Sequence, residues 1–81
     1  MIKNLNAYEN IDIIDDCDNR YTFTATAVEV FPDNPEEFRI HTVECITIFV
    51  VVRPKFAEDI YKMAPEDVLH MAWRDWFIEN D

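Results

Sequence analysis

The side chains best suited to metal binding or nucleophilic chemistry are two cysteines and two histidines: Cys17, His41, Cys45 and His70. The chain has no Cys-x-x-Cys or His-x-x-x-His pair, the spacings that usually begin a zinc site. In an extended strand, His41 and Cys45 would lie roughly 13 Å apart at about 3.3 Å per residue. We therefore expect neither a metal site nor a catalytic Cys–His pair. Cys45 is expected in the core, because free cysteine is usually buried, and His41 at a half-exposed strand position.

The aspartates between residues 12 and 18 form the densest group of oxygen ligands and invite comparison with a calcium loop. An EF-hand loop needs ligands at alternate positions, Gly at the sixth and Glu at the twelfth. Alternate positions after Asp16 reach Asp18 and then Arg20, a cation, and the chain contains no Gly. The segment therefore lacks the ligand pattern of a calcium loop.

The absence of both Gly and Ser from the sequence excludes further classes of site. Phosphate-binding loops, including the dinucleotide fingerprint, need Gly so that the backbone can approach the phosphates. A serine nucleophile is excluded directly. We accordingly expect a protein that is not an enzyme and that carries no cofactor.

Acidic side chains dominate the charge, because 17 Asp and Glu against 7 Lys and Arg give a net charge of −10. This balance opposes direct nucleic-acid binding, since contacts to phosphates require Lys and Arg. It favours a basic protein surface instead, because opposite potentials speed the encounter of two proteins. The candidate partner-binding residues form two groups, Asp12, Asp15, Asp16 and Asp18 in a turn-like segment and Asp33, Glu36 and Glu37 in a proline-flanked loop.

Strand-like segments occupy the middle of the chain. Residues 20–31 alternate between apolar and polar side chains, and the apolar side switches near Ala27, which indicates either a β-bulge or a strand end covered on both faces. Residues 32–37 hold two prolines and predict a loop. Residues 38–53 are rich in β-branched side chains and predict one long second strand. Together the two strands predict an antiparallel β-hairpin over residues 20–53.

The last third of the chain has apolar residues at helical spacing and predicts two C-terminal helices. The second helix is expected to open at Pro65 and to end near Glu79. Met71 and Ile78 would lie outside its buried arc, as candidates for a homotypic interface. Residues 1–19 fit a strand or a helix equally well. The expected fold class is α+β, with a small antiparallel sheet of two or three strands and two helices packed on one face.

The buried arc of the last helix is expected to carry both tryptophans, Trp73 and Trp76, against the sheet. Few charges protect residues 46–52 of the second strand, so a homodimer through a free edge of that strand is a further expectation. With 81 residues, the chain is expected to form a single compact domain over residues 1–81.

In length and acidity the chain resembles, as a class only, the small phage-encoded inhibitors of bacterial defence, including anti-CRISPR proteins and DNA mimics. The resemblance rests on no motif and transfers no residue role. It implies an acidic protein-binding module that blocks a basic surface of a nucleic-acid-binding protein. The alternative is a structural or assembly subunit that acts through homotypic association, and a small enzyme or metal protein ranks last.

The expected location is the cytoplasm, which would be the host cytoplasm for a viral protein. The first residues lack the apolar region of a secretory signal. The longest apolar run, Ile46 to Val52, is far too short to span a bilayer, so we expect no membrane contact.

Overall fold

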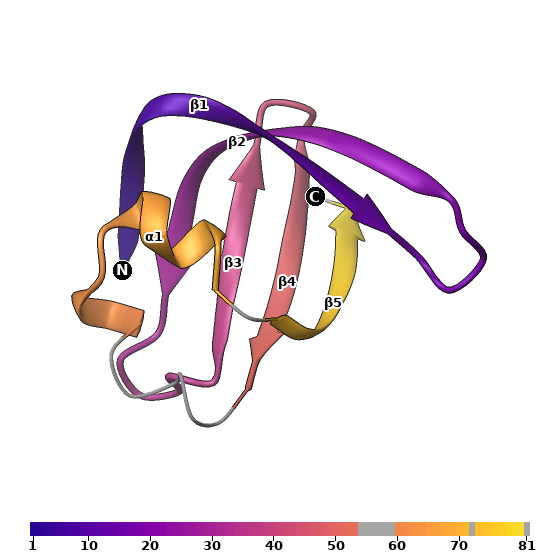
Figure 1. Ribbon diagram of the computed structural model, residues 1–81. Coiled ribbons are helices and arrows are strands. Elements are labelled where there is room, and N and C mark those ends of the chain that lie inside the picture. The colour runs from indigo at the N-terminus through magenta and orange to yellow at the C-terminus, as the bar shows by residue number, and fades with distance from the viewer. Residues whose placement is uncertain (54–59, 72, 81) are drawn as a thin grey trace.

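The computed structural model describes residues 1–53, 60–71 and 73–80 and shows one antiparallel sheet with a short helix beside it (Figure 1). Five strands lie in the order in which they occur along the chain, so each strand pairs with the next. The elements are β1 (Ile2–Ile14), β2 (Arg20–Val30), β3 (Glu37–Thr42), β4 (Ile46–Val52), α1 (Pro65–Leu69) and β5 (Trp73–Asn80). No helix among these residues is long and apolar enough to cross a membrane.

The fold is therefore mostly β, and the expected α+β class with two C-terminal helices is wrong. The predicted last helix stops after five residues, and its second half is the strand β5. Ile48 and Val50 of β4 are fully buried and pair with Ile78 and Trp76 of β5. This pairing with an apolar strand distant in sequence outweighs the helical spacing, because strand formation depends on cross-strand packing more than on intrinsic preference.

The segment predicted as one strand over residues 38–53 turns back on itself between β3 and β4. Cys45 lies in this turn at a φ of 60° and is exposed, so its expected place in the core is wrong. The hydroxyl of Thr42 closes the turn by donating to the carbonyl of Ile46 at 2.6 Å and accepting from its N–H at 3.3 Å. Because β4 lies between β3 and β5, the expected free edge on this apolar strand is also wrong.

The antiparallel pairing of β2 with β3 and the bulge near Ala27 are both confirmed. The register shifts by one residue between Ala25 and Ala27. The shift moves the core-facing positions from Phe23 and Ala25 to Val28 and Val30, which are all buried. The bulge thus lets one strand keep its apolar side chains inside the molecule along its whole length.

The N-terminal segment, which fitted a strand or a helix, is a strand. Ile11 and Ile13 are buried, whereas Tyr8 is exposed, so the alternation at the end of the segment decides its structure. The pairing of β1 with β2 is interrupted by a large bulge, because the register passes from Asn4 directly to Glu9.

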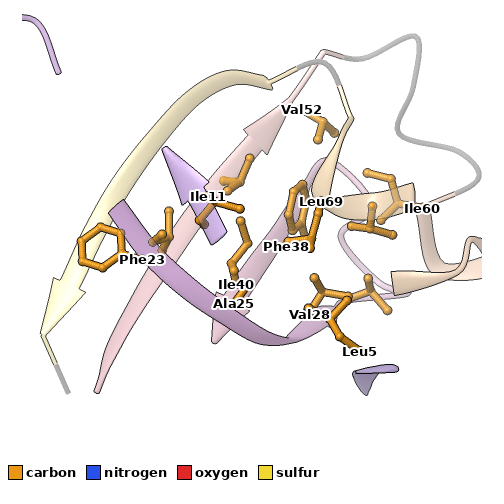
Figure 2. Packing of buried hydrophobic residues seen from close by; sticks show 14 of the residues in the cluster. Leu5, Ile11, Phe23, Ala25, Val28, Phe38, Ile40, Val52, Ile60 and Leu69 are labelled. Atoms are coloured by element: carbon orange, nitrogen blue, oxygen red, sulfur yellow. The ribbon is translucent and has the colours of Figure 1, made fainter. Parts of the chain in front are cut away.

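Buried side chains from the sheet and from the helical segment form one core (Figure 2). Phe38 is fully buried at its centre, between its cross-strand neighbours Val30 and Val50. Trp73 and Trp76 pack against this core as expected, but they are half-buried and reach it from β5 instead of from a helix.

The helix α1 begins at Pro65, as predicted, and covers the core with the buried side chains of Val68 and Leu69. It is preceded by a 3-10 turn at residues 60–62. The earlier part of the first predicted helix, residues 54–59, lies outside the described residues. Figure 2 shows Leu69 beside Phe38, where the helix meets the sheet.

The side chains of Lys3 and Glu66 help to attach this helical segment to β1. The ammonium group of Lys3 donates to the carbonyls of Tyr61 and Met63 at 2.5 and 2.9 Å. The carboxylate of Glu66 accepts from the backbone N–H of Asn6 at 3.0 Å, and this bond lowers the pKa of Glu66. The bulge in β1 is thereby held against the start of α1.

Candidate functional site

Asp15 organises the turn between β1 and β2 with its own side chain. One carboxylate oxygen accepts from the backbone N–H groups of Cys17 and Asn19, both at 2.9 Å. The other accepts from the side-chain amide of Asn19 at 3.1 Å and the hydroxyl of Tyr21 at 3.2 Å. These bonds, above all those from Asn19, lower the pKa of Asp15, and the bond to its carboxylate raises the pKa of Tyr21. Asp15 is therefore a structural residue of the turn.

The other three acids of the first predicted group project from the same hairpin. Asp12 accepts a hydrogen bond from the hydroxyl of Thr22 at 2.6 Å across the two strands. Asp16 and Asp18 are exposed, and the carboxylate of neither makes a hydrogen bond or ion pair within the described part of the chain. The turn thus presents two free carboxylates on a backbone that Asp15 holds in place.

The second predicted group, Asp33, Glu36 and Glu37, lies in or next to the turn between β2 and β3. That turn is at the opposite end of β2 from the first group (Figure 1). Asp33 and Glu36 are exposed, and Glu37 accepts from the side-chain amide of Asn34 at 2.8 Å. The structure therefore does not bring the two acidic groups together.

A groove of about 530 Å³ lies between the end of the β1–β2 hairpin and β5, and we call it the acidic groove. Figure 1 shows the hairpin extending past the sheet toward the end of β5. Its lining residues are Ile14, Asp15, Asp16 and Tyr21 from the hairpin side and Arg74, Asp75, Trp76, Phe77 and Ile78 from β5. The volume falls in the range of about 300–1,000 Å³ that is usual for binding sites.

The acidic groove combines negative charge with exposed apolar surface. Three carboxylates line it against one cation, Arg74, whose Nε atom lies 3.4 Å from a carboxylate oxygen of Asp75. Ile14 and Phe77 are 52% and 57% exposed, which is unusual for large apolar side chains that line a recess. Such a surface is suited to a ligand that carries both positive charge and apolar groups.

The sequence analysis named three of the residues that line this groove, Asp15, Asp16 and Ile78, but did not place the hairpin beside residues 74–78. Ile78, predicted as part of a homotypic interface, faces the core from β5 and also lines the groove. Met71, its predicted companion, is half-buried against the core. The missed signal was the alternation along residues 75–79, where Trp76 and Ile78 alternate with polar or exposed residues.

A second surface, which the sequence analysis also missed, lies on the solvent side of the sheet. There the guanidinium of Arg39 lies over the rings of Phe31 and Phe49, at 5.6 and 5.7 Å from their centroids. Phe77 pairs with Phe49 on the adjacent strand. The sequence did not predict this aromatic surface, because the continuous apolar run of β4 gave no sign of which of its side chains face outward.

The histidines contact carboxylates. A ring nitrogen of the half-buried His41 lies 3.1 Å from Glu29, and one of His70 lies 3.3 Å from Glu9. Across the part of the chain that the structure describes, no three His, Cys, Asp or Glu side chains are placed to hold a metal ion.

Comparison with known proteins assigns no relatives. No protein-family model, no curated protein and no solved structure matches the chain.

Proposed function

We propose that the protein is a small binding module that holds a basic surface of another protein in the acidic groove. The observation that carries this proposal is the meeting of carboxylates with the exposed side chains of Ile14 and Phe77 in one recess. Protein interfaces join apolar contacts that exclude water to charges that steer the encounter. The net charge of −10 extends an attractive field toward a basic partner.

The class of partner that we propose is a nucleic-acid-binding protein, because its phosphate-binding surface is rich in Lys and Arg. Occupation of that surface would make this chain an inhibitor, and a bacterial defence complex is one partner of this kind. The proposal does not require a continuous imitation of nucleic acid. The two acidic groups lie at opposite ends of β2, so the acidic groove is the surface on which the proposal depends.

The test compares two double charge reversals in the two turns. Asp16→Lys with Asp18→Lys alters the free carboxylates of the hairpin and leaves Asp15, which the turn needs, unchanged. Asp33→Lys with Glu36→Lys changes the net charge equally at the other end of β2 and serves as the matched control. The partner is first captured from a lysate of the source cells by the immobilised wild-type protein and is then purified.

We expect the hairpin variant to slow association with the captured partner by about tenfold or more at low salt, because the field near the groove is reversed. At physiological salt the effect should be smaller, since charges are screened beyond about 8 Å. The control variant should retain most of the wild-type association rate. Equal losses in both variants would show that overall charge acts without a specific site, and no loss in the hairpin variant would contradict the proposal.

Homotypic assembly is a second candidate function, because exposed apolar side chains also lie outside the groove. Met1 and Ile2 are each 59% exposed at the start of β1. Ile2→Lys should then abolish a concentration-dependent dimer mass measured by light scattering. A wild-type protein that remains a monomer at every concentration would contradict this second function.

A further inference from the structure

The strand β5 lies at one end of the sheet, and within the described residues it pairs only with β4. Five consecutive residues of this strand, 74–78, line the acidic groove. A sheet face presents every second residue, whereas a strand edge presents each residue in turn. The free edge of β5, with its backbone N–H and C=O groups, therefore lies in the groove.

The two edges of the sheet differ in their surroundings. Pairing of β5 with β4 runs without a register shift from Asp75 to Asn80. On β1, the corresponding edge is broken by the bulge between Asn4 and Glu9 and is tied to α1 through Glu66. Bulges and covering elements are the usual protection of an edge strand against pairing. Pairing of β5 with β4 does shift between Asp75 and Trp73, and β1 is regular from Glu9 to Ile14, so the edge of β5 is distinguished by its place in the acidic groove, which five of its consecutive residues line.

We propose that an extended basic segment of the partner adds to β5 as a sixth strand and lies in the acidic groove. This inference rests on the proposed function and specifies its mode of binding. Addition of a strand to an exposed sheet edge is an established mode of peptide recognition, in which the main chain supplies affinity and alternate side chains supply specificity. The five groove-lining residues of β5 would guide about 17 Å of an added strand, at about 3.4 Å per residue.

Core-facing and outward side chains alternate along β5, and this alternation sets the residue types expected in the added strand. Its core-facing side chains, Trp76 and Ile78, would lie beside apolar side chains of the partner. Its outward side chains, Asp75, Phe77 and Glu79, would lie beside basic ones. Carboxylates pair with Lys or Arg across strands, and the face of Phe77 also attracts a cation. The segment should therefore alternate between basic and apolar residues.

A second copy of this chain is the less favourable occupant of the edge. In an antiparallel pair of β5 strands centred on Phe77, each Asp75 would lie opposite a Glu79 of the partner copy. Like charges directly opposite each other destabilise strand pairing. Two molecules with a net charge of −10 also repel each other at a distance. Charge complementarity therefore favours a basic segment of another protein.

The probe is a synthetic heptapeptide, Lys-Val-Lys-Val-Lys-Val-Lys, added to the isotope-labelled full chain. At a peptide concentration about ten times its Kd, hydrogen exchange of newly bonded amides should slow by about tenfold. We expect this protection at alternate amides of residues 73–80, because only every second N–H of an edge strand points outward. A peptide of the same sequence with every backbone amide N-methylated should not bind, because neither of its edges can then donate hydrogen bonds to β5.

Three outcomes would overturn the strand-addition proposal. Either the exchange of β5 amides stays unchanged at saturating peptide, or the N-methylated peptide binds as well as the unmodified one. Protection of β5 that grows with protein concentration in the absence of peptide would assign the edge to a second copy and would also overturn it. A matched pair of variants adds a further condition: Asp75→Lys should weaken peptide binding at least tenfold, and Glu36→Lys should not.

These results separate the two proposals. If the hairpin charge reversal slows association with the captured partner while β5 shows no protection, the proposed function stands and strand addition is wrong. If β5 gains alternate protection while capture is insensitive to the hairpin charges, the groove binds extended peptides and the electrostatic basis of the proposed function is wrong.

Discussion

The structure of residues 73–80 makes opposite predictions for two adjacent side chains. Ile78 pairs with the fully buried Ile48 and packs against the core, whereas Phe77 points outward and is 57% exposed. Truncating Ile78 to Ala should therefore destabilise the protein far more than truncating Phe77, although Phe is the larger side chain. A helix over the same residues would instead place Ile78 away from the core.

The expected magnitudes follow from burial. Truncation of a fully buried Ile to Ala costs about 2–5 kcal/mol, and since Ile78 keeps some exposure we expect roughly 1–3 kcal/mol. Phe77→Ala removes mainly a cross-strand pair with Phe49, which contributes roughly 0.2–1 kcal/mol. In a domain of this size each kcal/mol corresponds to about 4–8 °C in Tm.

Urea unfolding and thermal scans of the wild type and both variants measure the difference. Ile78→Val supplies a graded control and should cost less than Ile78→Ala, because only one methylene is removed. Equal destabilisation by Ile78→Ala and Phe77→Ala would refute the strand assignment, as would a greater loss for Phe77→Ala. Comparable m-values in the three proteins would show that the same unfolding transition is observed.

Two further predictions concern the turns. Asp15→Asn should lower the urea midpoint at neutral pH. The difference from the wild type should shrink as the pH falls below 3.8, the ordinary pKa of the carboxyl, and should vanish below the lowered pKa of Asp15 in the folded protein. The sign follows because a carboxyl with a depressed pKa stabilises the fold only while it is ionised, and a difference independent of pH would contradict it. Cys45→Gly should raise the Tm by about 4–8 °C. Cys45 has a positive φ, which costs a non-Gly residue about 1–2 kcal/mol, and Gly removes this cost. The greater conformational freedom of Gly in the unfolded chain offsets part of the gain. Asp18→Gly, at a φ of 61°, is the control and should gain less, since Asp tolerates this region better.

The parts of the fold that were predicted from sequence are those with local signals. In β2, the switch of apolar side near Ala27 reports the bulge directly, because side chains alternate with a period of two. The loop after β2 contains two prolines, which cannot continue a strand ladder. The turn at Cys45 has no such marker, since it uses the hydroxyl of Thr42 and a non-Gly residue at positive φ.

The parts that could not be predicted depend on contacts between distant segments. Val68, Trp73 and Trp76 fit a helical arc, and only the buried face of β4 shows that the tryptophans belong to a strand. The candidate site likewise depends on a contact between segments that are distant in sequence. Asp16 was predicted as a partner-binding residue from its own neighbourhood, but the groove exists because the sheet brings the hairpin near residues 74–78, about sixty positions later in the chain.

The net charge and the free edge of β5 act together under these proposals. A free strand edge is a hazard for a small β protein, because an exposed strand of another molecule can pair with it. Here the hazard is limited by repulsion between copies and by the acids on β5, Asp75 and Glu79, which oppose pairing with a second β5. The same carboxylates attract a strand whose outward side chains are basic. Under these proposals, a single distribution of charge disfavours self-association and selects the class of partner, so this protein can keep the edge of β5 open from Asp75 to Asn80, where its pairing with β4 has no register shift.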